Sequence, residues 1–353
     1  MDVTRAWRLL TFLAALLLLP GLVAAPVHAA PAYVPVVPRA PLDQSAVMGL
    51  VTPGLVDINT TLDYQGAVGA GTGIVVDPSG EVLTNNHVIE GATEINATSL
   101  ANGRVYPVDV IGYDRANDIA LVRLNGAGDL PVAALASSTS VAVGDPIAAI
   151  GNAGGAGGAP SFSPGTVTQV GAAVRASDES GGGSRELTDL IRVAADIRPG
   201  DSGGPLVNSA GQVVGVNVAA TLTYQMGGVH GGEGFAIPID RAIGIANQIR
   251  AGAALPGVHM GDTAFIGVAI ADKDGGPPGA IVRQVLPDTP ARRAGLAGGD
   301  VITSVDGVPI NSASDLSDIM DQHHPGDTIV LSWTSVSGAP RSEPVVLAKG
   351  PVG

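Results

Sequence analysis

The sequence contains no cysteine among its 353 residues, which excludes both disulfide bonds and a lipid-modified cysteine. Aromatic residues are scarce at 3%, so the cores must be built from Val, Ile, Leu and Ala. Positive charge is also in short supply, because 18 Lys and Arg residues stand against 32 Asp and Glu. The net charge of -14 argues against nucleic acid as a partner and gives the surface a weak bias toward cationic ligands.

Glycine is abundant instead. The chain has 50 glycines and few helix-favouring runs, a combination that is typical of many turns and short strands. Hydrophobic residues make up 45% of the chain, which is enough to fill two or three domain cores. We therefore expect a multi-domain protein that consists mainly of strands.

Residues 1 to 30 have the three-part pattern of a secretory signal peptide: two arginines precede an apolar run at residues 9 to 19, and small residues follow. The run is too short for a comfortable membrane span, and an uncleaved membrane anchor is the alternative. Cleavage is expected after Ala29 or Ala30, with Ala32 as a further candidate. The protein is therefore expected to be secreted, either outside the cell or in its envelope.

Residues 200 to 205 read Gly-Asp-Ser-Gly-Gly-Pro, so that Ser202 lies among glycines that leave the backbone open to a substrate carbonyl. The tetrahedral intermediate of acyl transfer carries a negative charge that backbone N–H groups stabilise well. Those of Gly200 and Ser202 are the natural pair for such an oxyanion hole. A glycine-flanked serine on its own is more typical of a simple turn.

A serine hydroxyl becomes a good nucleophile when a neutral imidazole takes its proton and a carboxylate orients that imidazole. His87 ends a short apolar stretch, and Asp118 stands at the start of an apolar strand pattern. Taken alone, His87 reads as a core histidine and Asp118 as a strand cap. Together with Ser202 they follow the chymotrypsin order His, Asp, Ser, which subtilisin and the α/β hydrolases do not share. We therefore predict a catalytic triad.

These motifs identify a family resemblance. The chain resembles the trypsin-like serine proteases of the HtrA/DegP family with one PDZ domain, from about Ala46 to Lys349, and most of all a secreted mycobacterial member. The resemblance implies that His87 is the general base and acid, Asp118 its orienting carboxylate and Ser202 the nucleophile. The motifs that carry it are TNNHVI at 84 to 89, DRANDIALVRL at 114 to 124, GDSGGPLVN at 200 to 208 and GFAIPID at 234 to 240.

The expected fold class is all-β: a chymotrypsin-like double β-barrel protease followed by a small α+β PDZ domain. The first barrel is expected near residues 46 to 136, beginning with a strand at 51 to 59, and the second near 141 to 238. A helix at 239 to 250 has one apolar face and closes the protease. The expected boundaries are 31 to 45 for a Pro-rich mobile N-terminus, 46 to 250 for the protease domain, 251 to 263 for a linker and 264 to 349 for the PDZ domain.

Two loops of the second barrel, at residues 151 to 164 and 177 to 184, are too rich in small residues to pack a core. They read either as flexible surface connections or as borders of the substrate cleft. The family resemblance implies the second role, with ordering when substrate or an activator binds.

The predicted PDZ domain begins with Phe265-Ile266-Gly267-Val268, which matches the carboxylate-binding loop of the family. The resemblance implies that the glycine lets consecutive N–H groups face the terminal carboxylate of a peptide. That peptide would add as a strand beside Val268, with the helix at 314 to 322, including Leu316, as the groove wall. Peptide C-termini are therefore the expected partners of this domain.

Specificity before the scissile bond is left open between basic and small aliphatic side chains. Asp196 lies six residues before Ser202, where basic-specific trypsins carry an aspartate, although the family usually has a small residue there. Ile197 narrows the pocket wall, and Arg198 is placed to neutralise the carboxylate. The residues expected to form the specificity pocket are Asp196, Ile197, Val218, Ala219 and Gly234.

Asp201 departs from the asparagine that most family members carry before the nucleophile. A buried carboxylate without a partner is costly, so Asp201 requires one, and Arg198 is a candidate. No cofactor is implied. His323-His324 reads as a polar helix end rather than as a metal site, and the glycine-rich residues 69 to 73 lack the lysine of a phosphate loop.

The function that these patterns favour is a secreted serine endopeptidase that hydrolyses unfolded or damaged proteins through an acyl-enzyme. One alternative is a latent protease that acts mainly as a peptide-binding chaperone. Another is an esterase that uses the same triad on small acyl esters. Assembly into a homo-oligomer stays open.

Overall fold

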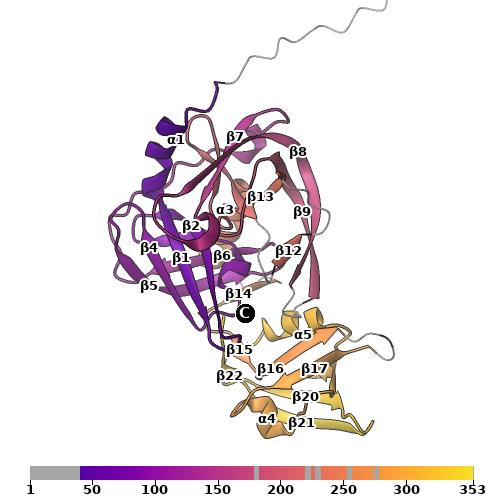
Figure 1. The fold of residues 1–353 in the computed structure, drawn as a ribbon. Coiled ribbons are helices and arrows are strands. Elements are labelled where there is room, and N and C mark those ends of the chain that lie inside the picture. The colour runs from indigo at the N-terminus through magenta and orange to yellow at the C-terminus, as the bar shows by residue number, and fades with distance from the viewer. Residues whose placement is uncertain are drawn as a thin grey trace, which may run out of the picture. The chain divides into compact units, whose positions relative to one another are not determined.

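The computed structural model describes residues 40–178, 183–218, 224–226, 232–252, 257–272, 275 and 278–352 (Figure 1). The predicted signal peptide and the centre of the 177 to 184 loop lie outside these residues. The described residues belong to one compact unit of the chain. Within them, no helix has the length and apolar character needed to cross a membrane.

A short helix precedes the first barrel. Helix α1 (Gln44–Val51) is N-capped by Asp43, whose carboxylate accepts the Ala46 N–H at 3.1 Å. The prediction of a strand from Val51 is therefore wrong at its beginning, because Val51 ends α1 and the first strand starts at Leu55. The N-cap aspartate is the local signal for this helix.

The first barrel contains six strands in a closed sheet. Its order runs β5-β4-β1-β2-β3-β6, and β5 pairs with β6 to close it. A further strand, β14 (Val258–Met260), pairs with β5, so the predicted linker contains a strand of the first barrel's sheet. The strands are β1 (Leu55–Leu62), β2 (Ala67–Asp77), β3 (Glu81–Thr84), β4 (Glu94–Ser99), β5 (Val105–Asp114) and β6 (Ile119–Leu124).

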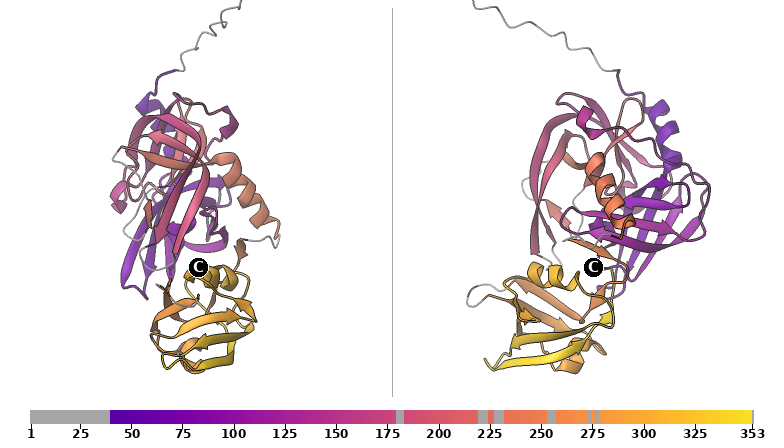
Figure 2. Two further views of the ribbon diagram at one scale, coloured as in Figure 1. Left: turned by 90° about the vertical axis from the view of Figure 1, so that its right-hand side faces the viewer. Right: turned by 180° about the vertical axis from the view of Figure 1, so that it is seen from behind.

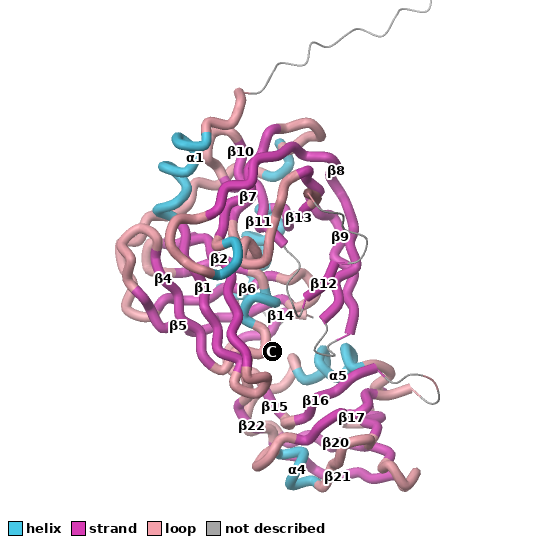
Figure 3. The backbone as a smooth tube through the Cα atoms, viewed as in Figure 1, coloured by secondary structure: helices cyan, strands magenta, loops and turns pink. Residues whose placement is uncertain are grey.

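The second barrel repeats this plan. Its sheet order is β8-β7-β10-β11-β13-β9, closed by pairing of β8 with β9, and the short β12 (Tyr224–Met226) adds to β8. The long hairpin of β8 and β9 is prominent in Figure 3. The strands are β7 (Pro146–Gly151), β8 (Ser161–Asp178), β9 (Gly183–Ala194), β10 (Pro205–Asn208), β11 (Val213–Val218) and β13 (Gly234–Pro238).

Helix α3 (Ile239–Arg250) follows the second barrel, within the bounds that its apolar spacing predicts. It packs against β11 and β6, one strand from each barrel, and Figure 2 shows it lying along the outside of the strands. Its buried residues are Ile239, Ala242, Ile245, Ala246 and Ile249. The helix therefore ties the two barrels together with an aliphatic face.

The C-terminal domain has a five-strand path, β16-β17-β18-β20-β21, in which β19 also pairs with β18. Aliphatic side chains fill its core, with Trp333 as the one large aromatic among its buried described residues. Together with the two barrels, this domain confirms the predicted mostly-β architecture. Its elements are β15 (Ala264–Phe265), β16 (Val268–Asp272), β17 (Ala280–Val285), α4 (Pro290–Ala294), β18 (Val301–Val305), β19 (Val308–Pro309), α5 (Ala313–Met320), β20 (Thr328–Thr334), β21 (Pro340–Val346) and β22 (Ala348–Lys349).

Candidate active site

His87 and Asp118 are held together at two points. His87 lies in the single-turn helix α2 (Asn86–Ile89) that follows β3, and Asp118 ends the turn before β6. The Asp118 carboxylate accepts the His87 backbone N–H at 2.9 Å and lies 2.8 Å from His87 Nδ1. Because a carboxylate only accepts, Nδ1 carries the proton in this arrangement and Nε2 is left as the basic nitrogen.

The backbone of Asp118 is itself fixed. Its φ is +54°, in the left-handed region, and its C=O accepts a hydrogen bond from Asn85 Nδ2 at 2.9 Å. Asn85 is fully buried and lies two residues before His87. The segment from Asn85 to His87 therefore both carries the imidazole and binds the main chain of Asp118.

Ser202 lies in the turn before β10, and its segment adjoins the same strands. Its C=O accepts the Thr72 N–H of β2 at 2.8 Å. A Cβ on the next residue, Gly203, would approach Thr84 Oγ1 to 2.1 Å, and Thr84 is the last residue of β3 before the His87 segment. Ser202 itself is fully buried. The structure therefore brings the Ser202 turn against the strands that lead to His87.

The predicted oxyanion residue Gly200 has a fixed peptide plane. Its φ is +96°, and a Cβ there would come within 2.0 Å of the Asn152 carbonyl oxygen, so glycine is required. The preceding carbonyl, that of Pro199, accepts the Gly154 N–H at 2.7 Å. Since C=O and N–H point in opposite directions in a trans peptide, the Gly200 N–H points away from Gly154.

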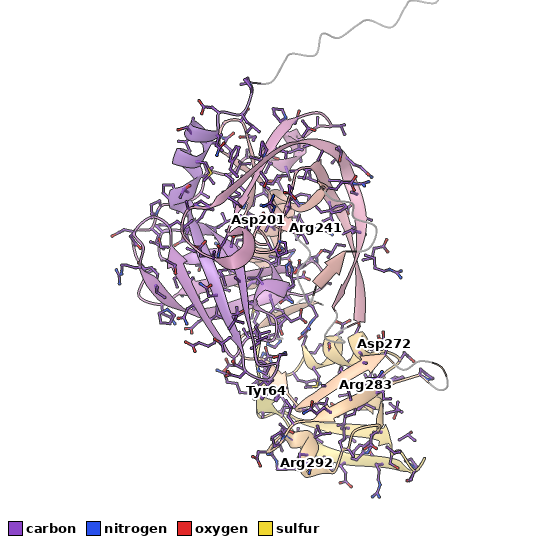
Figure 4. The ribbon with its side chains drawn as sticks, in the orientation of Figure 1. Tyr64, Asp201, Arg241, Asp272, Arg283 and Arg292 are labelled. Carbon is purple, nitrogen blue, oxygen red and sulfur yellow. The ribbon has the colours of Figure 1, made fainter. Side chains whose placement is uncertain are left out.

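Asp201 has two partners, of which the sequence suggested Arg198 but not Ser161. Its side chain is fully buried (Figure 4), and it accepts hydrogen bonds from Ser161 Oγ at 2.6 Å and from the Arg198 backbone N–H at 2.9 Å. Burial raises the pKa of Asp201 above its ordinary value, and the Ser161 hydrogen bond opposes that rise. The candidate Arg198 contributes its main chain, whereas its guanidinium pairs with Asp196.

The residues expected to form the specificity pocket have different environments. Asp196 is exposed, with 55% of its side chain accessible, and is paired with Arg198. A Cβ on Gly234 would lie 2.4 Å from Ile197 Cδ1, so Ile197 fills the space that Gly234 leaves. Val218 is fully buried, and Ala219 lies outside the described residues.

The predicted carboxylate-binding loop lies between β15 and β16. Gly267 has a φ of +85°, and a Cβ there would be 2.2 Å from Thr289 Cβ. The carbonyls of Ile266 and Gly267 are bound by the N–H groups of Ala291 and Leu286. A cavity of about 380 Å³ adjoins the loop, lined by Phe265, Ile266, Gly267, Val268 and Leu316, and also by His87 and Arg115.

Arg115 is a residue of this region that sequence reasoning missed. It lies three residues before Asp118 and is almost fully buried. Its guanidinium donates to Glu90, three residues after His87, at 2.8 Å, and to both oxygens of Asp321 at 2.9 Å. The DRANDIALVRL motif contains Arg115, but its two carboxylate partners are distant in sequence.

Among the described residues, no group of three or more His, Asp or Glu side chains is placed to hold a metal ion. The arrangement supplies instead an oriented imidazole and carboxylate beside a buried serine turn, which are the groups that acyl transfer requires.

Comparison with known proteins gives two domain matches: residues 71–216 match the trypsin-like peptidase domain, and residues 264–334 match the PDZ domain. The chain is 37% identical over 266 residues to the putative serine protease HhoA of Synechocystis, covering 72% of this chain and 64% of that protein. It is 36% identical over 316 residues to the serine protease PepD of Mycobacterium tuberculosis, covering 86% of this chain and 65% of that protein. It thus spans just under two thirds of the length of these relatives.

A solved structure gives a similar match. A variant of the HtrA-type protease AlgW, solved with a tripeptide, is 26% identical and aligns with a TM-score of 0.50, covering 88% of this chain and 99% of that one.

Proposed function

Because the chain belongs to the HtrA family, with a trypsin-like peptidase domain followed by one PDZ domain, we propose that it is a serine endopeptidase. The observation that carries the proposal is the two-point contact of the Asp118 carboxylate with His87, at its backbone N–H and at Nδ1. This contact fixes the imidazole in the tautomer that a general base needs.

In the proposed mechanism, Ser202 Oγ attacks the carbonyl carbon of the scissile bond while His87 Nε2 takes the hydroxyl proton. The negative charge on the tetrahedral intermediate is stabilised by the N–H groups of Gly200 and Ser202. His87 then gives the proton to the leaving amine, which leaves an acyl-enzyme on Ser202. Water activated by His87 hydrolyses that ester, and Asp118 stabilises the imidazolium in both halves of the reaction.

We propose unfolded or damaged proteins as substrates, with the PDZ domain binding polypeptide C-termini. The structural support is the Phe265 to Val268 loop, in which Gly267 adopts the backbone conformation that a carboxylate-binding turn requires. The export signal pattern of residues 1 to 30 supports a location of the proposed activity outside the cell or in its envelope. Homo-oligomerisation stays a prediction.

The test is hydrolysis of unfolded casein and of a small acyl ester by the full-length protein, with and without a serine-directed phosphonate. The Ser202→Ala variant is the matched control, because it removes one oxygen from a turn held by backbone contacts. Caseinolysis that the phosphonate blocks and that Ser202→Ala lacks supports the endopeptidase. Removal of the Ser202 hydroxyl should lower kcat by roughly a millionfold, as for other triad nucleophiles, with an unchanged melting curve.

Other outcomes select the alternatives. Ester hydrolysis without caseinolysis would assign an esterase. Equal suppression of client aggregation by the wild type and Ser202→Ala, with no hydrolysis of either substrate, would assign a chaperone.

A further inference from the structure

Two buried polar side chains lie side by side on the wall of the first barrel, and neither belongs to the predicted triad. Asp57 of β1 and Thr72 of β2 are directly opposite each other in the antiparallel pair, so their side chains are on the same face of the sheet. Asp57 is 3% exposed and Thr72 is 1% exposed.

Thr72 contacts the Ser202 turn of the second barrel through its side chain and its main chain. Its hydroxyl donates to the Gly200 carbonyl at 2.7 Å and accepts the Asn152 N–H at 2.9 Å. Its own N–H donates to the Ser202 carbonyl at 2.8 Å. Thr72 therefore holds the carbonyls of both residues whose N–H groups form the proposed oxyanion hole.

Asp57 lies against the turn that supports Gly200. Its Oδ2 is 3.6 Å from the position of a Cβ on Gly157, and the Gly158 N–H favours the ionised form of its carboxylate. The same turn contains Gly154, whose N–H binds the Pro199 carbonyl at 2.7 Å. Asp57 thus lies at the Gly157–Gly158 end of the turn. At its other end, Gly154 fixes the Pro199–Gly200 peptide, which bears the Gly200 N–H.

The turn has an internal tie between these two ends. Asn152 Oδ1 accepts the Gly157 N–H at 2.8 Å, and the Asn152 N–H binds Thr72. The contacts of Asp57 and Thr72 therefore meet in one short glycine-rich turn, residues 152 to 158. This is part of the 151 to 164 loop, whose composition left open whether it is a surface connection or a border of the cleft.

Asp57 is placed in an unfavourable environment for a carboxylate. Its strand partners are Thr72 and Thr98, and residues 152 to 158 carry no charged side chain. Burial accordingly raises the pKa of Asp57 to about 6. A buried carboxylate with a raised pKa lowers the stability of the folded protein at neutral pH. Side chains that are unfavourable for folding in this way are concentrated at functional sites.

We propose that Asp57 and Thr72 are positioning residues of the oxyanion hole, by which the first barrel fixes the two peptide groups on either side of Gly200 in the second. This inference rests on the proposed endopeptidase function. Thr72 acts on the Gly200 carbonyl directly, and Asp57 acts through the 152 to 158 turn. Ionised Asp57 binds the Gly158 N–H more strongly than the neutral acid does, so the turn is held best when the carboxylate is charged.

The test of Thr72 compares Thr72→Val, which removes the hydroxyl at nearly constant volume, with Thr72→Ser, which keeps it. With a short peptide substrate, Thr72→Val should lower kcat by about 10²-fold, the loss typical of one oxyanion donor, with KM nearly unchanged. The inhibition constant of a peptide boronate should rise by a similar factor. Thr72→Ser should stay within a few-fold of the wild type.

The control is Thr98→Val, because Thr98 flanks Asp57 on β4 and makes no hydrogen bond to the 199 to 204 turn in the described structure. Its kcat should match that of the wild type. Equal kcat in Thr72→Val and wild type would overturn the role of Thr72. If Thr72→Val does not fold, a loss of kcat of about 10²-fold in Thr72→Ser, which keeps the hydroxyl, would also overturn it.

The test of Asp57 is the ratio of wild-type kcat to Asp57→Asn kcat between pH 5 and pH 8. The amide is a neutral acceptor that does not titrate, and pH-dependent steps that the two proteins share cancel in the ratio. We expect a ratio of about 10 at pH 8 that falls toward 1 below pH 6, together with a melting temperature of Asp57→Asn at pH 8 that equals or exceeds that of the wild type.

A ratio that is constant across this pH range, or a lower melting temperature with unchanged kcat, would make Asp57 a structural residue and overturn its role. Hydrogen exchange of amides 152 to 158, faster in Asp57→Asn than in the wild type at pH 8, is the readout that does not depend on activity. Wild-type protein that neither cleaves peptides nor reacts with the phosphonate would instead refute the proposed function itself.

Discussion

At the scale of single residues, the carboxylate before the nucleophile shows how local donors make a buried charge tolerable. Asp201 is fully buried, and two donors satisfy it: the Ser161 hydroxyl, from the start of β8, and the Arg198 main-chain N–H. A hydroxyl from a strand and a neighbouring backbone amide therefore satisfy this buried carboxylate.

Ser161→Ala should destabilise the protein by about 1–3 kcal/mol, the cost of leaving a buried acceptor with one donor fewer. The folded-state pKa of Asp201 is already raised, and losing the Ser161 hydrogen bond raises it further. A raised folded pKa gives stability at low pH that is lost as pH rises through that pKa. The deficit, measured by urea unfolding, should therefore be larger at pH 8 than at pH 4.

The control for this substitution is Ser163→Ala, because the hydroxyl of the half-buried Ser163 binds only the Asp196 carbonyl among the described contacts. Its stability should stay within about 0.5 kcal/mol of the wild type. An equal and pH-independent deficit in both variants would contradict the role given to Ser161.

The predicted specificity pocket also depends on single side chains. Ile197 lies against Gly234, whereas Asp196 is exposed and paired with Arg198. We predict cleavage after small aliphatic residues, unchanged in Asp196→Ala, and acceptance of larger side chains in Ile197→Ala, which empties the space beside Gly234. Sequencing the fragments of cleaved casein gives the measurement. Enrichment of Arg or Lys before the scissile bond that disappears in Asp196→Ala would show the opposite preference.

At the scale of elements, the loop between β15 and β16 depends on one glycine. Gly267 combines a φ of +85° with a position where a Cβ would overlap Thr289, so a side chain there must displace the loop that faces the cavity. The two elements that border the predicted peptide groove, β16 and α5, are held by other contacts. Val268 of β16 pairs with Val285 on β17, and Leu316 of α5 is buried in the domain core.

Gly267→Val should therefore weaken binding of a peptide with a hydrophobic C-terminus at least tenfold, while turnover of a short internal peptide stays within a few-fold. Fluorescence anisotropy measures the binding, with the C-terminally amidated peptide as the ligand control. Gly338→Val is the matched protein control, since Gly338 also has a positive φ, of +83°, but has open space around it. Undiminished affinity in Gly267→Val would remove the carboxylate-binding role from this loop.

At the scale of the whole molecule, the peptidase and PDZ regions share contacts that their sequence boundaries do not suggest. Strand β14, inside the predicted linker, pairs with β5, and His259 on β14 stacks on Tyr113 at 5.0 Å. Tyr113 and Arg115 both donate to Asp321 at the end of α5. Val352 exchanges backbone hydrogen bonds with Gly91 and Ala92, just after α2.

Two truncations should consequently differ. A chain ending at Gly252 loses β14 and exposes the edge of β5, whereas one ending at Gly261 keeps this strand. We expect the longer fragment to melt at a higher temperature and to hydrolyse a short peptide measurably, with altered cleavage of casein because the PDZ domain is gone. Calorimetry and peptide kinetics on both fragments test this. Identical melting temperatures would show that β14 contributes nothing to the barrel.

Much of the fold follows from local sequence. The apolar spacing of residues 239 to 250 coincides with α3, and the helix expected at 314 to 322 overlaps α5. Helix α1 was missed although Pro53 and Gly54 just after it are helix-ending residues. With only eight residues, the helix is too short to show a clear helical repeat of apolar side chains. The strand in the linker was missed because three residues pair with β5 only across the tertiary fold, and no local pattern reports such a partner.

The sequence by itself determined the order of the predicted triad, the two glycines that the serine turn requires and the aliphatic character of the cores, because each depends on residue type and near neighbours. Only the tertiary structure decided which donors meet Asp201, that Arg198 pairs with Asp196, that Ile197 fills the space at Gly234, and that Asp57 and Thr72 reach the second barrel. Most of these contacts join residues that are far apart in the chain. In the case of Arg198, two carboxylates are near in sequence and the structure shows which of them its guanidinium binds. They are therefore set by the packing of strands and barrels against one another and not by local preference.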